Sequence, residues 1–140
     1  MSWDLIILNS TKPVDFEKDN WKDFESTNYV ANRIKKTFPE STWNDFSWGN
    51  LENEFADIEF NIGNENDFGN NFLVHVRGGI NPLEEIVRMC KENNWIAYDM
   101  SKESFVDLEN PNSDGFEKWK RFRNATFEEK EKSKKPWWKF

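Results

Sequence analysis

Cysteine and histidine are almost missing from this chain, which has one of each among 140 residues. A single thiol, Cys90, excludes an internal disulfide and any zinc site built on several cysteine ligands. A single imidazole, His75, leaves acid–base catalysis with few groups to use, because no paired nucleophile or phosphate loop accompanies it. The sequence therefore favours a non-enzymatic protein, and it predicts no catalytic residues, metal ion or cofactor.

Long apolar runs are missing as well. No stretch approaches the roughly 18 consecutive apolar residues of a membrane-spanning helix, and the mean hydropathy is −0.92. The N-terminal run "LIIL" is too short for a secretion signal and follows no basic segment. These absences predict a soluble cytoplasmic protein without a membrane interaction.

Aromatic residues are abundant, and charge is distributed unevenly. Thirteen Phe and eight Trp predict a single-domain core led by large rings. Residues 1–117 carry 10 Lys and Arg against 23 Asp and Glu, whereas residues 118–140 carry 9 against 3. An acidic body repels nucleic acid and suits a basic protein partner. A merely solvated acidic surface is the alternative explanation.

Hydrophobic periodicity predicts five strands, in 2–9, 46–53, 54–62, 71–77 and 95–100, and two helices, in 26–38 and 81–94. The order β-α-β-β-β-α-β favours an α+β domain over 1–109, a mainly antiparallel sheet with both helices on one face. The first strand is apolar on both sides, which is typical of a central strand. Residues 110–140 form a basic, aromatic C-terminal extension with a weak helical pattern, and we expect it to dock on the acidic body.

The segments 54–62 and 71–77 alternate clearly enough to predict a hairpin and its register. Even-numbered residues from Ala56 to Val76 should face the core. One register places Phe60 opposite Val74, Glu59 opposite His75 and Asp57 opposite Arg77. A shifted register places Asp57 opposite His75 instead.

Four ionisable residues of this hairpin, Asp57, Glu59, His75 and Arg77, are the candidate binding patch. In one interpretation Glu59 and His75 form an acid–base couple and Arg77 holds an anion. In the other, which we favour, they are ordinary cross-strand pairs. The glycines of "RGG" either expose backbone N–H groups to an anion or make a tight turn.

Other candidates have structural alternatives too. Cys90 falls on an apolar helical stripe, which favours a core residue over a reactive thiol. Three aspartates, at positions 4, 45 and 99, lack the spacing of a metal motif. Trp48, Trp137 and Trp138 are candidate aromatic contacts. The last two belong to "KKPWWKF", a combination that can also bind single-stranded nucleic acid or lipid, although the acidic body argues against both.

The segments "MSWDLII", "FSWGNLE", "ADIEFNIG", "FLVHVRGG" and "WIAYDMS" together resemble a family of short uncharacterised bacterial proteins, over about residues 1–107. The resemblance implies a small cytoplasmic α+β domain and carries no activity. In general character the chain is also similar to immunity proteins that neutralise secreted toxins. We therefore expect a protein-binding module, with an immunity protein as its more specific form. The alternative is a small-ligand-binding domain or enzyme that uses Glu59, His75 and Arg77.

Overall fold

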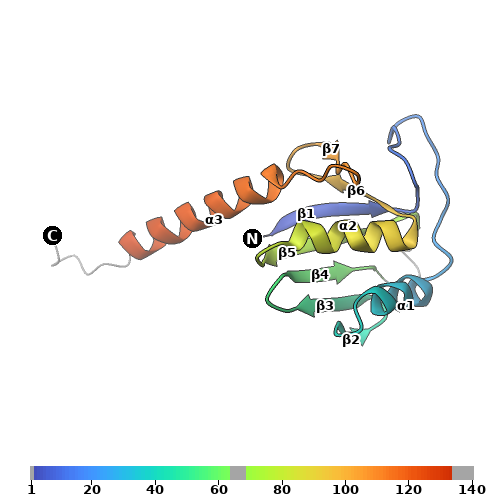
Figure 1. Cartoon of the computed structure of the whole chain (residues 1–140), viewed down its shortest axis with the longest axis horizontal. Coiled ribbons are helices and arrows are strands. Elements are labelled where there is room, and N and C mark those ends of the chain that lie inside the picture. The colour runs from blue at the N-terminus through green and yellow to red at the C-terminus, as the bar shows by residue number, and fades with distance from the viewer. Residues whose placement is uncertain (1, 64–68, 134–140) are drawn as a thin grey trace.

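The computed structural model describes residues 2–63 and 69–133, with side chains through Ala125. Within these residues the fold is α+β: one antiparallel sheet of seven strands, in the order β2-β3-β4-β5-β1-β6-β7, and three helices (Figure 1). The strands are β1 Trp3–Leu8, β2 Thr42–Asp45, β3 Trp48–Glu52, β4 Asp57–Asn61, β5 Asn71–Gly78, β6 Ile96–Asp99 and β7 Ser104–Phe105. The helices are α1 Thr27–Thr37, α2 Pro82–Asn93 and α3 Asp114–Ser133.

The ends of α1 and α2 follow from the local chemistry of the residues at their termini. The Ser26 side chain accepts a hydrogen bond from the Tyr29 backbone N–H at 3.0 Å and so caps α1. Pro82 occupies the first turn of α2, where its missing N–H leaves no intrahelical bond unmade. Asn94 ends that helix in the left-handed conformation, with φ of 58°.

Both helices cover the same face of the sheet, as predicted (Figure 1). β1 lies between β5 and β6, so it is an interior strand, in agreement with its apolar pattern. The even-numbered residues of the hairpin face the helices and are buried: Ala56, Ile58, Phe60, Ile62, Phe72, Val74 and Val76. Phe60 stacks between Phe38 of the loop after α1 and Trp43 of β2, at 6.1 Å from each ring.

The predicted hairpin register is correct except at its open end. Phe60 lies opposite Val74 and Glu59 opposite His75. The expected pairing of Asp57 with Arg77 is wrong, because the ladder shifts between Asp57 and Ile58 and places Asp57 opposite Gly78. Arg77 is thus the extra residue of a β-bulge, a feature that side-chain alternation cannot predict.

Two strands, β2 and β7, were not predicted. They occupy the two edges of the sheet. β2 is mostly exposed and β7 has two residues, so neither carries an alternating apolar pattern. Trp43 of β2 lies over Gly49 of β3, whose missing side chain leaves room for the indole: a Cβ there would come within 2.6 Å of the ring.

The opposite face of the sheet is partly covered by the long connection between β1 and α1. Phe16 of this connection makes ring contacts with Tyr98 of β6 and Phe105 of β7. Trp21 of the same connection donates its indole N–H to the Asn70 carbonyl at 2.9 Å. The covered part is therefore the β6–β7 edge, while the hairpin's ionisable residues lie on the rest of this face.

The third helix, α3, begins against the body and then leaves it (Figure 1). Phe116 and Trp119 are buried, and Phe116 packs on Trp3 at 5.5 Å between ring centroids. Arg123 donates to the Arg77 carbonyl at 3.1 Å. The first turns of α3 therefore pack on the body, whereas residues 134–140 lie outside the described part of the chain, so the docking of the extension over 110–140 stays a prediction.

Removing the side-chain amide of Asn93 should destabilise the packing of α1 on α2. This buried amide accepts from Arg33 Nε at 2.6 Å and donates to Thr37 Oγ1 at 3.2 Å and to the Met89 carbonyl at 2.8 Å. Because Asn93→Ala leaves these buried groups without their partner, we expect the free energy of unfolding to fall by about 1–3 kcal/mol in urea titrations. The exposed Asn32→Ala on α1 is the control, and an equal loss in both variants would contradict this role.

Candidate functional site

The four residues of the predicted patch do not act as one unit. Glu59 and His75 oppose each other in the ladder, yet each binds a different partner. His75 Nδ1 lies 2.7 Å from an Asp4 carboxylate oxygen on β1. Arg77 Nη2 donates to Glu59 Oε2 at 2.9 Å. These are two separate cross-strand pairs, a His–Asp contact and an Arg–Glu ion pair, and Asp57 belongs to neither.

The environment of these pairs is that of a sheet surface. The side chains of His75 and Asp4 are 22% and 39% exposed, and those of Arg77 and Glu59 are 54% and 10% exposed. Glu59 is thus shielded by its own cation. The hollows described below are lined by other residues. The arrangement supports the interpretation as cross-strand pairs and gives no support to an acid–base couple.

Removing the Arg77 side chain should destabilise the protein through Glu59. Arg77→Ala leaves a mostly buried carboxylate without its cation, and we expect a loss of about 1–2 kcal/mol in the free energy of unfolding. Adding Glu59→Gln should recover part of this loss, because an amide needs no cation. A double-mutant cycle by urea denaturation measures the coupling, and additive effects of the two substitutions would contradict the pairing.

The candidate aromatic contacts are only partly described. Trp48 is half-buried on β3, opposite Asn61. Trp137 and Trp138 lie outside the described residues. The indole rings of Trp3 and Trp95 belong to the core.

Cys90 is a core residue, as predicted. It is fully buried on α2, and burial raises the pKa of its thiol to about 12. Because the thiolate is the reactive form, we expect no reaction with Ellman's reagent until the protein unfolds. The raised pKa also makes folding stability fall above about pH 9, where the unfolded thiol ionises and the folded one does not. Rapid labelling under native conditions would contradict this prediction.

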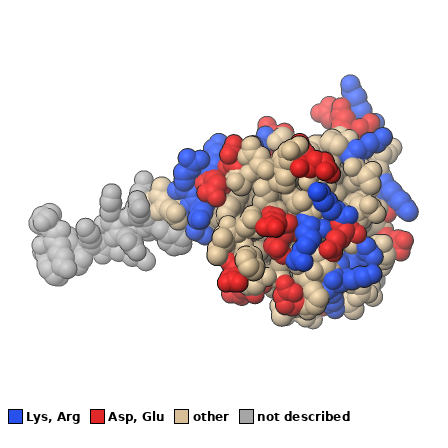
Figure 2. Space-filling view, viewed as in Figure 1, with Lys and Arg blue, Asp and Glu red and all other residues tan. Residues whose placement is uncertain are grey.

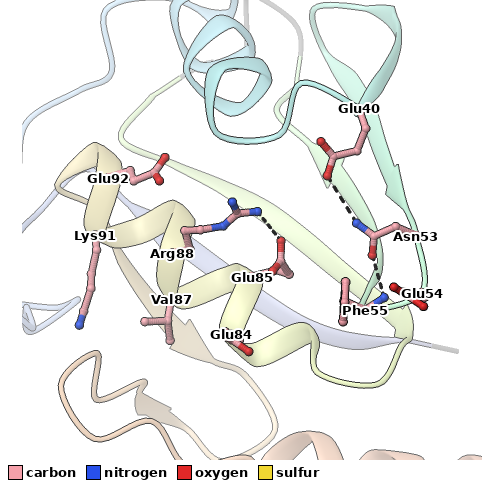
Figure 3. A pocket seen from close by; sticks show the side chains of 10 residues that line it. All are labelled: Glu40, Asn53, Glu54, Phe55, Glu84, Glu85, Val87, Arg88, Lys91 and Glu92. Carbon is pink, nitrogen blue, oxygen red and sulfur yellow. Dashed lines mark hydrogen bonds and ion pairs between the residues drawn. The ribbon is translucent and has the colours of Figure 1, made fainter.

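An open groove of about 690 Å³ lies beside α2 (Figure 3). One wall is α2 itself, and the other is the β3–β4 turn together with the loop after α1. The turn is internally fixed, because Asn53 Oδ1 accepts from the backbone N–H groups of Phe55 and Ala56 at 2.8 and 2.9 Å. Ten residues line the groove: Glu40, Asn53, Glu54, Phe55, Glu84, Glu85, Val87, Arg88, Lys91 and Glu92.

We call this hollow the α2 groove. Its lining is predominantly acidic with an apolar component. It carries five glutamates against one arginine and one lysine. Arg88 is held in place, since it donates to Glu85 at 2.6 Å and its guanidinium lies 4.9 Å from the Phe38 ring centroid. Phe55 lines the groove and is 49% exposed. The same face of the molecule shows acidic and basic side chains gathered over α2 (Figure 2).

A smaller hollow of about 300 Å³ continues the α2 groove on the other side of α2. Glu84 and Val87 line both, and Pro111 and Ser113 form the far wall of the smaller one. The outward side of α2 is therefore a ridge with a depression on each flank. Such a surface offers a protein or peptide contact along the helix, with charged edges and an apolar floor.

The sequence predicts one wall of this groove but not the other. The polar side of the helix predicted in 81–94 identifies Glu84, Glu85, Arg88, Lys91 and Glu92 as outward-facing residues. The opposite wall comes from a turn that is distant in sequence. Its position depends on how the β5–α2 connection packs against Phe55, which periodicity does not report.

Three comparisons with known proteins found no match: a scan of family models, a search of curated proteins and a search of solved structures. The resemblance to short bacterial proteins therefore stays a prediction. None of the described helices is long and apolar enough to span a membrane. Among the described residues, no group of three or more His, Cys, Asp or Glu is placed to hold a metal ion.

Proposed function

We propose that this chain is a non-enzymatic protein-binding module whose α2 groove receives a basic segment of another protein. The observation that carries the proposal is the groove itself: five glutamates surround an exposed phenylalanine on a wall that is fixed by internal hydrogen bonds. Acidic groups around an apolar floor favour a cationic partner over an anionic one, and they raise its rate of encounter.

The more specific form of this proposal is an immunity protein that works in the bacterial cytoplasm. Its partner is then a basic toxin domain whose active surface the groove covers. Two features support a blocking role over a catalytic one. On the sheet face His75 is paired with Asp4 and Arg77 with Glu59, and Cys90 is buried with a raised pKa.

Reversing the charge of the groove tests the proposal. Glu54 and Glu92 are both exposed and line opposite walls, so Glu54→Lys with Glu92→Lys changes the groove with little effect on the fold. The matched control reverses two exposed acids of the β1–α1 connection, Glu17→Lys with Glu25→Lys, and so gives the same net charge. Each full-length chain is immobilised and presented with lysate of the source cells at about 0.05 M salt.

We expect the wild-type chain and the control to retain the same strongly basic protein. The groove variant should retain it about tenfold less, and about 0.5 M salt should release it from all three. Equal recovery by the groove variant and the control, or recovery only of acidic proteins, would contradict the proposal.

A further inference from the structure

A second feature of the chain complements the α2 groove. Residues 134–140, "KKPWWKF", contain three Lys, two Trp and one Phe and no acidic residue. The groove presents an excess of three negative charges, five Glu against Arg88 and Lys91, together with the exposed Phe55 ring. The positive charge and the aromatic rings of this segment complement the negative charge and the exposed phenylalanine of the groove.

Residues 134–140 follow the end of α3, so the direction of α3 limits which part of their own body they can reach. The last described contact of α3 with the body is the bond from Arg123 to the Arg77 carbonyl, and beyond it the helix runs away from the sheet (Figure 1). From Arg123 to Ser133 the helix rises about 15 Å, and seven extended residues span about 25 Å at most. If residues 134–140 turned back along α3, their end would therefore reach at most about 10 Å beyond Arg123 toward the body.

The groove is longer than this remaining reach. It follows α2, whose 12 residues extend about 18 Å. Residues 134–140 of the same chain would meet at most its near end, around Glu54 and Phe55, while α3 stays helical. A neighbouring molecule has no such restriction and can lay the segment along the whole groove.

We propose that the α2 groove binds residues 134–140 of a second copy of this chain. This inference rests on the proposed function, since it takes the groove as a protein-binding surface and names its occupant when the basic partner is absent. The lysines meet Glu54 and Glu92 on the two walls, and the indole rings cover Phe55 and stack on the guanidinium of Arg88. A basic partner then competes with the segment for the same surface.

If each of two molecules places its segment in the groove of the other, they form a symmetric dimer. If each molecule binds the segment of the next, a longer assembly forms. In both cases the particle mass in low salt exceeds the 16.8 kDa of one chain. Sedimentation equilibrium of the full chain measures this mass directly. The groove variant Glu54→Lys with Glu92→Lys should associate about tenfold more weakly, and the Glu17→Lys with Glu25→Lys control should match the wild type.

A charge swap distinguishes a second copy from the chain's own segment. Lys134→Glu with Lys135→Glu makes the segment acidic, and it should weaken self-association about tenfold, as the groove variant does. Mixing the two variants pairs an acidic segment with a basic groove, so association should return in the mixture alone. Own-chain docking gives no such recovery. A full chain that stays at monomer mass in low salt, or a mixture that fails to associate, would overturn the proposal.

Zero-length cross-linking of an equal mixture of isotopically light and heavy full chains provides the second measurement. We expect links from Lys134, Lys135 or Lys139 to groove glutamates, about half of them joining light to heavy chains. Links within one isotope only would identify own-chain docking and overturn the inference. Loss of these links with intact, groove-dependent capture of a basic lysate protein would reject the inference while the proposed function stands.

Discussion

Replacing Phe60 by alanine is expected to lower the free energy of unfolding by about 3–5 kcal/mol, close to the limit that a small domain tolerates. Phe60 is fully buried on β4, between β3 and β5. Its ring stacks on Phe38 at an interplanar angle of 23° and on Trp43 at 10°. The substitution therefore leaves a cavity and removes two ring contacts that join β4 to the loop after α1 and to β2.

Urea denaturation followed by tryptophan fluorescence measures this loss. The control is Phe46→Ala, because Phe46 is 40% exposed and its described ring contact is with Lys35 at 4.9 Å. That contact contributes about 1 kcal/mol or less. Similar losses in the two variants would contradict the burial of Phe60 in the core.

Replacing Gly79 by alanine is expected to destabilise the protein by about 3 kcal/mol and to deform the α2 groove. Gly79 has φ of 117°, a conformation that residues with a Cβ rarely adopt. An added Cβ would also lie 2.4 Å from the Phe55 carbonyl oxygen, which is backbone and has little freedom to move. The same oxygen accepts from the Asn81 N–H at 2.9 Å, so the β5–α2 turn and the groove wall shift together.

The matched control for this prediction is Gly69→Ala. A Cβ at Gly69 would meet no atom within 4 Å, and its φ is outside the left-handed region. That variant should keep wild-type stability to within about 1 kcal/mol. Thermal unfolding together with partner binding checks both effects of Gly79→Ala. A stable variant with normal binding would show that the Phe55 wall does not depend on this turn.

The fold was predictable where one face of an element is apolar and the other polar. The alternation from Ala56 to Val76 gave the hairpin and its main register, and apolar periodicity gave the helices in 26–38 and 81–94. These signals are local and each reflects burial of one face. The edge strands β2 and β7 bury too little to carry such a signal.

The site was less predictable, because it depends on tertiary contacts. Because of the bulge at Arg77, Asp57 lies opposite Gly78 and not opposite Arg77. Arg77 pairs with Glu59. The partner of His75 is Asp4, which lies on β1 outside the hairpin. The α2 groove needs a helix and a distant turn at the same time. Its charges were visible in the sequence, but the surface that they form was not.

The most direct test of the central claim compares two surfaces in one binding measurement. The claim is that partners bind in the α2 groove, away from the ion pairs on the opposite face of the sheet. Calorimetric titration with the basic protein that the wild-type chain retains gives the affinity of each variant. The groove variant Glu54→Lys with Glu92→Lys should bind about tenfold more weakly, and His75→Gln with Arg77→Gln should stay within about twofold of the wild type. Loss of affinity only in the sheet-face variant would contradict the claim.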